Sequence, residues 1–397
     1  MPAADSLRKL PPSLSTSSIA MRVISTLGAF LSAMAVTGAA SAADPSVNGT
    51  ILLGQVAPFS GPSVKLAEEY NLGARTYFQA LNERGGVNGL RVELRTRDDR
   101  YDPAETARQA KALIEQDGVF ALFGTVGTGT TLAAVPVATA AGVPLFAPST
   151  GAEALRTPLN RQVFHVRAGY GAEADYIAEQ LSTSSLRNVA VLHQSDAFGK
   201  AALEAVTHAL TQRGLKTVAL AAIERDATDV SEIGKKLAAG HPQAVILAAS
   251  YTSSAAVIKT MKKQGFAGQF VATSYAGSKA LADELGGEGS GVWISEVVPF
   301  PWGEGSALQR EYGQALQRAG VPSRSFESME GYLAAKVFTE GLRRAGREPT
   351  RARLIAALES IQGWDAGGVR ISYSPTDHGG SHRVEMTMIG PGGKFVH

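Results

Sequence analysis

The sequence contains no cysteine among its 397 residues. Disulfide scaffolds, cysteine-ligated metal sites, a cysteine nucleophile and a lipid-modified N-terminal cysteine are therefore excluded. Hydrophobic residues make up 44% of the chain, an ordinary share for a globular protein. At ~100 to 200 residues per domain, the length predicts two or three domains with sizeable cores.

The chain also lacks an excess of either charge. It has 38 Lys and Arg against 36 Asp and Glu, a formal net charge of +2. Residues 1–42 contain Arg8, Lys9, Arg22 and Asp5, so the rest of the chain carries 35 charges of each sign. The sequence has no overall excess of basic residues and no local run of Lys or Arg, and we therefore expect no nucleic-acid partner.

The N-terminal segment has the pattern of a secretory signal. Arg22 precedes an uncharged apolar stretch over residues 23–36, which is followed by small residues ending at Ala42. A membrane anchor is the alternative, but the stretch is shorter than the ~20 residues that span a bilayer. We expect a signal peptide over residues 1–42 and, in a Gram-negative bacterium, a soluble periplasmic protein; initiation at Met1 or at Met21 stays open.

Short apolar runs alternate with longer amphipathic segments in the rest of the chain, which is typical of parallel α/β sheets. The expected strands are residues 50–56, 91–96, 119–123, 143–146, 189–193, 217–223, 244–248, 270–273 and 292–297. The expected helices lie near residues 71–84, 103–116, 132–141, 173–181, 199–212, 231–239, 254–264, 307–319, 329–345 and 351–358. The clearest helix start is Asp102, with Pro103 and Glu105 behind it, because these residues suit the N-cap, N1 and N3 positions.

Two α/β domains without a long linker would be joined by short crossings. Candidate crossings lie near residues 167–171, 298–301 and 367–372. Three crossings would make each domain discontinuous, and paired α/β domains of this kind can close about a hinge. Ligands of such sheets bind beyond the carboxyl ends of the strands, so the loops there are the candidate site.

The first candidate loop is GTVGTGTT at residues 124–131, between a strand and an apolar helix. Its glycines allow close backbone approach, while the Thr128 hydroxyl and N–H groups at the helix start can hold an anion. Neither the phosphate-binding G-K-[ST] pattern nor G-x-G-x-x-G is present, which disfavours a nucleotide. The loop favours a small carboxylate, and a merely tight turn is the alternative.

The next strand end carries a similar loop, with Ser149, Thr150 and Gly151. Ser149 offers a hydroxyl and a backbone N–H, so two neighbouring loops suggest one shared site. The alternative is that Ser149 or Thr150 caps a short helix that contains Glu153.

Three loops in the second half of the chain add aromatic and hydroxyl side chains. Asp196 is placed to cap a helix, and Phe198 is expected to be exposed at the mouth of the site or to act as a hydrophobic staple. Tyr251 and Ser274 follow two further strands. Flat aromatic faces with polar tips suit the walls of a ligand site.

These loops contain few groups that move protons or attack a substrate, so we expect no enzyme. G-x-S-x-G and H-E-x-x-H are absent. His378 and His382 lie in a segment of turn composition, and Asp98 and Asp99 precede the expected cap Asp102. We therefore expect no metal and no cofactor.

Together these segments resemble the substrate-binding proteins of branched-chain amino acid ABC transporters, the leucine-binding type of the type I periplasmic binding fold. The resemblance covers essentially all of the chain after residue 42. It rests on QVAPFSGP at residues 55–62, NERGGVNG at 82–89, DDRYDP at 98–103, the loop at 124–131, VP at 143–144 with PS at 148–149, and DAFG at 196–199.

The resemblance implies an α/β protein with two doubly wound parallel-sheet lobes joined by three hinge crossings. Residues 43–168 and 301–369 would form the first lobe. Residues 169–300 and 370–397 would form the second.

The resemblance also implies a ligand carboxylate held in the first lobe. Thr128 matches the hydroxyl position, Ser149 the backbone contact that follows, and Thr150 would line the same loop. Gly151 stands where amino-acid binders often have Thr, and Ser274 stands where they commonly have an acidic residue against the ligand amine. Both are departures from the family pattern.

In the second lobe, Phe198 and Tyr251 match positions where the family has aromatic residues over the ligand. The function implied is a monomeric periplasmic receptor that delivers a small carboxylate of the branched-chain amino acid class to an inner-membrane ABC permease. The alternative is a ligand-sensing receptor domain for an aromatic or keto acid without an amine.

Overall fold

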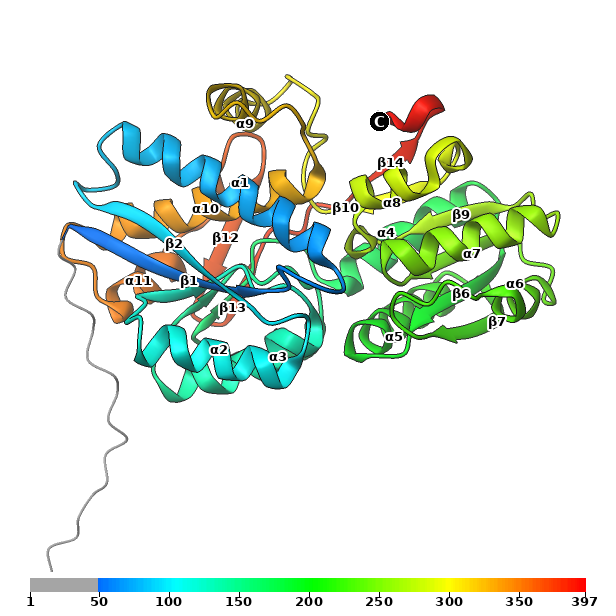
Figure 1. Ribbon diagram of the computed structural model, residues 1–397, viewed down its shortest axis with the longest axis horizontal. Coiled ribbons are helices and arrows are strands. Elements are labelled where there is room, and N and C mark those ends of the chain that lie inside the picture. The colour runs from blue at the N-terminus through cyan, green and yellow to red at the C-terminus, as the bar shows by residue number, and fades with distance from the viewer. Residues whose placement is uncertain (1–48) are drawn as a thin grey trace, which may run out of the picture. The chain divides into compact units, whose positions relative to one another are not determined.

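The computed structural model describes residues 49–397 (Figure 1). The expected signal peptide therefore lies outside the described residues. None of the helices within residues 49–397 is long and apolar enough to cross a membrane.

The first sheet has five parallel strands in the order β2-β1-β3-β4-β5. Its register places Leu53 beside Leu94 on one side and Ala121 on the other. Its strands are β1 (Thr50–Ala57), β2 (Arg91–Asp98), β3 (Ala121–Phe123), β4 (Leu145–Phe146) and β5 (Val163–Phe164). Burial on both faces explains why β1, β3 and β4 appear in the sequence as apolar runs, whereas the edge strand β2 alternates exposed and buried residues over its first half.

Helices cover both faces of the first sheet. One hydrophobic cluster joins its strands to residues of α1, α9, α10 and α11, and another joins them to α2 and α3. Figure 1 shows α1 beside α10, although they are far apart in the sequence. The helices are α1 (Val64–Glu83), α2 (Pro103–Glu115), α3 (Thr128–Ala140), α9 (Ala307–Arg318), α10 (Phe326–Ala345) and α11 (Arg351–Glu359), with the short 3-10 helix η1 (Glu153–Leu155).

The second sheet has the order β15-β14-β10-β9-β8-β6-β7, with β14 and β15 antiparallel to their neighbours. Residues of α4 and α5 pack on one face, and residues of α6, α7 and α8 on the other. Its strands are β6 (Asn188–Gln194), β7 (Lys216–Ile223), β8 (Ala244–Ala248), β9 (Gln269–Ala272), β10 (Trp293–Glu296), β14 (Glu385–Ile389) and β15 (Phe395–Val396). Its helices are α4 (Tyr170–Thr183), α5 (Ala197–Gln212), α6 (Ser231–Ala238), α7 (Tyr251–Lys263) and α8 (Ser278–Leu285), and short 3-10 helices occur at η2 (Ser274–Ala276), η3 (Gly286–Gly289) and η4 (Pro391–Gly393).

Helix starts follow the capping residues. Asp102 accepts a hydrogen bond from the backbone N–H of Glu105 at 2.9 Å, and Pro103 is the first helical residue, as predicted. Several helices begin a few residues earlier than predicted; α3 starts at Thr128 rather than near residue 132. The predicted α/β fold with doubly wound parallel sheets is confirmed.

A small third sheet shows that one crossing between the two large sheets lies later in the chain than the sequence predicted. It consists of β11 (Trp364–Asp365), β12 (Arg370–Ser374) and β13 (Asp377–Gly380). Ile371 and Tyr373 of β12 lie in the same hydrophobic cluster as Phe146 and Phe164 of the first sheet. Residues 370–380 therefore belong with the first sheet. The sequence suggested that they belong with the second sheet, and that expectation is wrong. The chain crosses to β14 over residues 381–384 instead of 367–372, because apolar packing holds β12 in the first core.

Candidate functional site

Three hydroxyl groups form a chain where β3 and β4 end. The Thr128 hydroxyl lies 2.7 Å from that of Thr150, which lies 3.2 Å from the phenol oxygen of Tyr170. A backbone bridge between Val126 and Ser149 holds the two loops together. All three hydroxyl-bearing residues are buried, so their hydrogen-bonding groups are shielded from bulk water.

The start of α3 adds backbone donors to this place. The first intrahelical bond runs from the N–H of Thr131 to the carbonyl of Gly127 at 3.1 Å. The N–H groups of residues 128–130 therefore have no acceptor within the helix, and the helix dipole places partial positive charge there. Gly127 supports the turn, since its φ of 103° favours glycine. An anionic group such as a carboxylate suits this arrangement.

Ser149 has hydrogen-bond partners within the protein. Its backbone N–H donates to the carbonyl of Thr125 at 2.7 Å, because the two strand-end loops pair with each other. That N–H is therefore engaged within the paired loops, and the expected backbone contact between Ser149 and a ligand stays a prediction. The Ser149 hydroxyl hydrogen-bonds Glu330 of α10, a carboxyl that the sequence did not single out.

Phe198 is fully buried. One expectation from the sequence was that it is exposed at the mouth of the site, and that expectation is wrong. The centroid of its ring lies 4.2 Å from that of Tyr275 and 5.7 Å from that of Tyr170, so two aromatic rings pack against it. The phenol oxygen of Tyr275 lies 2.6 Å from that of Tyr101, which follows β2 of the first sheet. Aromatic residues from both sheets thus pack beside the hydroxyl chain.

Asp196 caps α5, as expected, by accepting from the N–H of Gly199 at 3.1 Å. Its carboxylate also pairs with Arg225, whose guanidinium lies 3.7 Å from the ring centroid of Tyr101. Both roles of this carboxylate are therefore within the protein: it caps α5 and forms an ion pair with Arg225.

Tyr251 is partly buried and belongs to the same hydrophobic cluster as Tyr170 and Phe198. It also borders a cavity of about 160 Å³, together with Leu66 of α1 and Gly277. Burial raises the pKa of Tyr251 above its ordinary value, and the carboxylate of Asp226 adds to the increase. The phenol therefore stays protonated at neutral pH and can donate a hydrogen bond.

Ser274 lies in a charged network that the sequence did not indicate. Its N–H and hydroxyl donate to Glu173 at 2.6 and 3.1 Å, and it also hydrogen-bonds Arg167. The Ser295 hydroxyl donates to the same carboxylate of Glu173 at 2.5 Å. An acidic group thus lies beside Ser274, although it comes from α4.

One buried arginine lies within ion-pair distance of two buried carboxyl groups in this network. Arg167 lies 3.6 Å from Glu173 and 3.5 Å from Glu330. Burial raises the pKa of Glu330, and the positive charge of Arg167 lowers it in part. Burial opposes the charge of Arg167, but the attraction of Glu330 and Glu173 outweighs it and raises the pKa of the guanidinium. The network has one fewer positive charge than it has carboxyls.

The model of the family described as "Periplasmic binding protein" matches residues 50–394. The chain belongs to the periplasmic binding protein family. A substrate-binding periplasmic protein from Ralstonia solanacearum has 31% identity and a TM-score of 0.81, with 87% of this chain and 99% of that chain covered.

Two further relatives of this periplasmic binding protein have names that mention a ligand. A possible leucine/isoleucine/valine-binding protein from Rhodopirellula baltica has 26% identity and a TM-score of 0.83, covering 89% of this chain and 98% of that one. The Leu/Ile/Val-binding protein homolog 3 of Brucella melitensis is 25% identical over 82% of this chain and 88% of its own length.

His378, Asp98 and Asp99 are engaged with other protein groups in this periplasmic binding protein. The ring of His378 stacks on Phe164 at 3.7 Å, and its Nδ1 donates to the carbonyl of Val163 at 2.9 Å. Asp98 accepts from three backbone N–H groups, and Asp99 accepts from Tyr101 and Thr106. Residues 49–397 contain no group of three or more His, Asp or Glu that could hold a metal ion.

Gly151 leaves room for Tyr170. A Cβ at position 151 would come within 2.6 Å of the Tyr170 ring and 2.7 Å of its backbone nitrogen. We predict that Gly151→Thr destabilises this periplasmic binding protein by about 1–3 kcal/mol, because the backbone must move. Chemical denaturation measures the loss, and Gly129→Ala is the control, since its nearest neighbour would be 3.6 Å away. Equal stability of the two variants would contradict the packing described for Tyr170.

Proposed function

We propose that this protein is a periplasmic receptor that binds a small carboxylate ligand between two lobes and delivers it to an inner-membrane ABC permease. The observation that carries the proposal is the buried chain of Thr128, Thr150 and Tyr170 at the start of α3. Hydroxyl groups and unpaired helix N–H groups together complement a carboxylate.

The charged network supports a ligand of the amino acid class. Glu173 and Glu330 share the single positive charge of Arg167. A ligand ammonium near Glu330 would supply a second positive charge, and Ser149 links Glu330 to the loop of Thr150. The names of the Rhodopirellula and Brucella relatives point to the same class.

The rest of the proposal follows from the family. The protein would be exported by a signal peptide over residues 1–42, act as a monomer and release its ligand unchanged. Among the site residues, we propose that Thr128, Thr150 and Tyr170 contact the carboxylate, with Phe198 and Tyr251 as apolar walls. Ser149, Gly151 and Ser274 would shape the site indirectly, through Glu330, Tyr170 and Glu173.

A thermal-shift screen of the protein from Ala43 onward tests the proposal. The panel contains leucine, isoleucine, valine, 4-methyl-2-oxopentanoate and benzoate. A ligand at 100 times its dissociation constant should stabilise the protein by ~2.7 kcal/mol. Stabilisation by the amino acids supports the proposed class, while stabilisation by the two other acids alone refutes the role given to Glu330. A panel without any stabilising acid would contradict carboxylate binding itself.

A further inference from the structure

An acidic residue lies where an element of the first sheet meets an element of the second. Glu327 is in the first turn of α10, which packs on the first sheet. It borders the 160 Å³ cavity together with Gly277 and Lys279 at the start of α8, which packs on the second sheet. The two helices are in contact with each other, and Glu327 lies on the α10 side of the cavity between them.

The carboxylate of Glu327 lacks well-placed partners in this arrangement. Both of its oxygens are buried and have no hydrogen bond of good geometry among the described residues, although the residue as a whole is partly exposed. The backbone N–H groups of Ser278 and of Glu327 itself are the donors near them, and they lower its pKa only in part. A buried ionised carboxylate without a partner is costly, whereas the protonated carboxylic acid costs much less. The geometry therefore favours the protonated form of Glu327.

Most of the charged groups around Glu327 are acidic and add to this cost. Glu69 of α1 and Glu330 of α10 are acidic, and so is Glu296 of β10, which accepts a hydrogen bond from the hydroxyl of Ser278, the first residue of α8. The nearby cation Lys279 is paired with Asp283 at 2.6 Å, and its weaker attraction to Glu69 and Glu327 comes after that pairing.

The remaining charges at the cavity are likewise engaged or face water. Lys65 is paired with Glu68 at 3.1 Å, and Glu284 is exposed. Burial raises the pKa of Glu327 to about 7, and repulsion by Glu69 adds to the increase.

We propose that closing of the two lobes takes up one proton at Glu327, so that the closed form is favoured at acidic pH. The inference rests on the proposed function, because it requires lobes that open and close. When the lobes separate, α8 leaves α10 and water reaches the carboxylate, which then has the ordinary affinity of a glutamate for protons.

The direction of the effect follows from linkage. The proton is held more tightly in the closed form than in the open form. The preference for the closed form is therefore fully present at pH values below the ordinary glutamate pKa of 4.5, and it is lost as the pH rises through about 7. Between pH 5.5 and pH 8, the ratio of closed to open molecules should fall about 30-fold.

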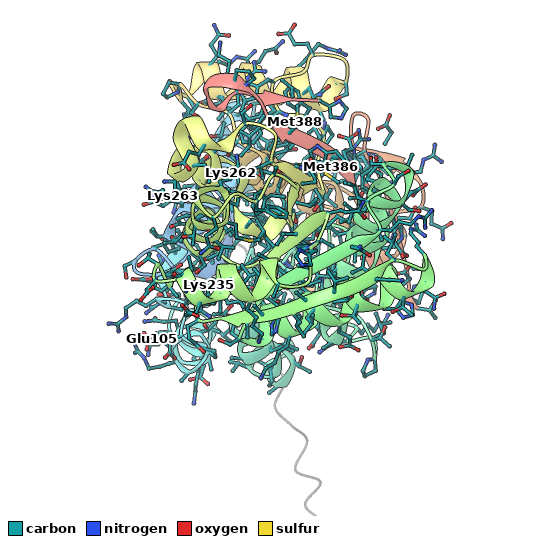
Figure 2. All side chains as sticks on the ribbon, turned by 90° about the vertical axis from the view of Figure 1, so that its right-hand side faces the viewer. Glu105, Lys235, Lys262, Lys263, Met386 and Met388 are labelled. Carbon is teal, nitrogen blue, oxygen red and sulfur yellow. The ribbon has the colours of Figure 1, made fainter. Side chains whose placement is uncertain are left out.

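The absence of cysteine provides a direct measurement. Cysteines introduced at Lys111 of α2 and Lys263 of α7 would be the only two thiols for spin labels, and both positions are exposed. Lys263 lies at the outer surface of α7 in Figure 2. Distance distributions between the labels, recorded without added ligand from pH 5.5 to pH 8, report the open and closed populations.

Two variants assign the effect. Glu327→Gln mimics the protonated side chain, so we expect its closed fraction to be high and independent of pH. Glu284→Gln removes an exposed carboxylate from the same cavity and should retain the pH dependence of the unaltered protein. A pH response that survives in Glu327→Gln would overturn the inference.

Ligand addition separates this inference from the proposed function. If a stabilising acid shortens the label distance while pH has no effect, the proposed function stands and the proton uptake is refuted. If neither acid nor pH changes the distance, closing itself is contradicted, and both fail.

Discussion

Replacing Arg167 by methionine should lower the free energy of unfolding by about 3–5 kcal/mol. The side chain of Arg167 is only 2% exposed and is the cation beside Glu173 and Glu330. Methionine has similar length and fills most of the same volume, so the main change is electrostatic. Two buried carboxyls would then lie close together without a positive charge, and at least one would have to take up a proton.

Chemical denaturation at pH 7.5 measures this loss. Arg97→Met is the matched control, because Arg97 is 28% exposed and pairs with Asp117, which also binds Arg95. A partly exposed pair of this kind should contribute less than about 1 kcal/mol. Adding Glu173→Gln to Arg167→Met removes one of the two unpaired charges and should recover part of the stability. Similar losses for Arg167→Met and Arg97→Met would show that the buried network does not depend on its arginine.

Local sequence signals were sufficient for most of the fold. The cap at Asp102 and the apolar runs of the parallel strands depend on neighbours in the chain, and both were placed within a few residues. The segment at residues 377–380 has the composition of a turn, yet it forms β13, because its pairing with β12 depends on residues elsewhere in the fold. Tertiary packing of Ile371 likewise moved the last crossing.

Only part of the candidate site could be predicted from the sequence, because the rest depends on contacts between residues far apart in the chain. Thr128 and Thr150 follow strands and stand beside glycines, which is a local pattern. Arg167, Glu173 and Glu330 stand in helices or crossings, with no motif around them, and only folding brings them together. The exposure of a residue at a strand end is also set by its partners, and the sequence therefore could not show that aromatic rings enclose the side chain of Phe198.

Replacing Thr128 by valine should weaken binding of the carboxylate ligand about 10-fold to 100-fold while leaving the fold intact. A hydrogen bond to a charged group contributes about 1.5–3 kcal/mol, and valine has the shape of threonine without its hydroxyl. Thr150 would keep its contact with Tyr170 at 3.2 Å, so the loss of stability should be near 1 kcal/mol. Calorimetric titration with the most stabilising acid of the panel measures the change.

The control for Thr128→Val is Thr131→Val, one turn further along α3. Thr131 is also buried, and its hydroxyl lies 2.9 Å from that of Thr125, so this variant loses a hydroxyl–hydroxyl contact of the same kind. Because that contact joins α3 to its preceding loop, Thr131→Val should lose similar stability and keep its affinity. If both variants bind the acid as the unaltered protein does, the carboxylate is not held at the start of α3. If both lose affinity equally, packing of α3 rather than the Thr128 hydroxyl determines binding.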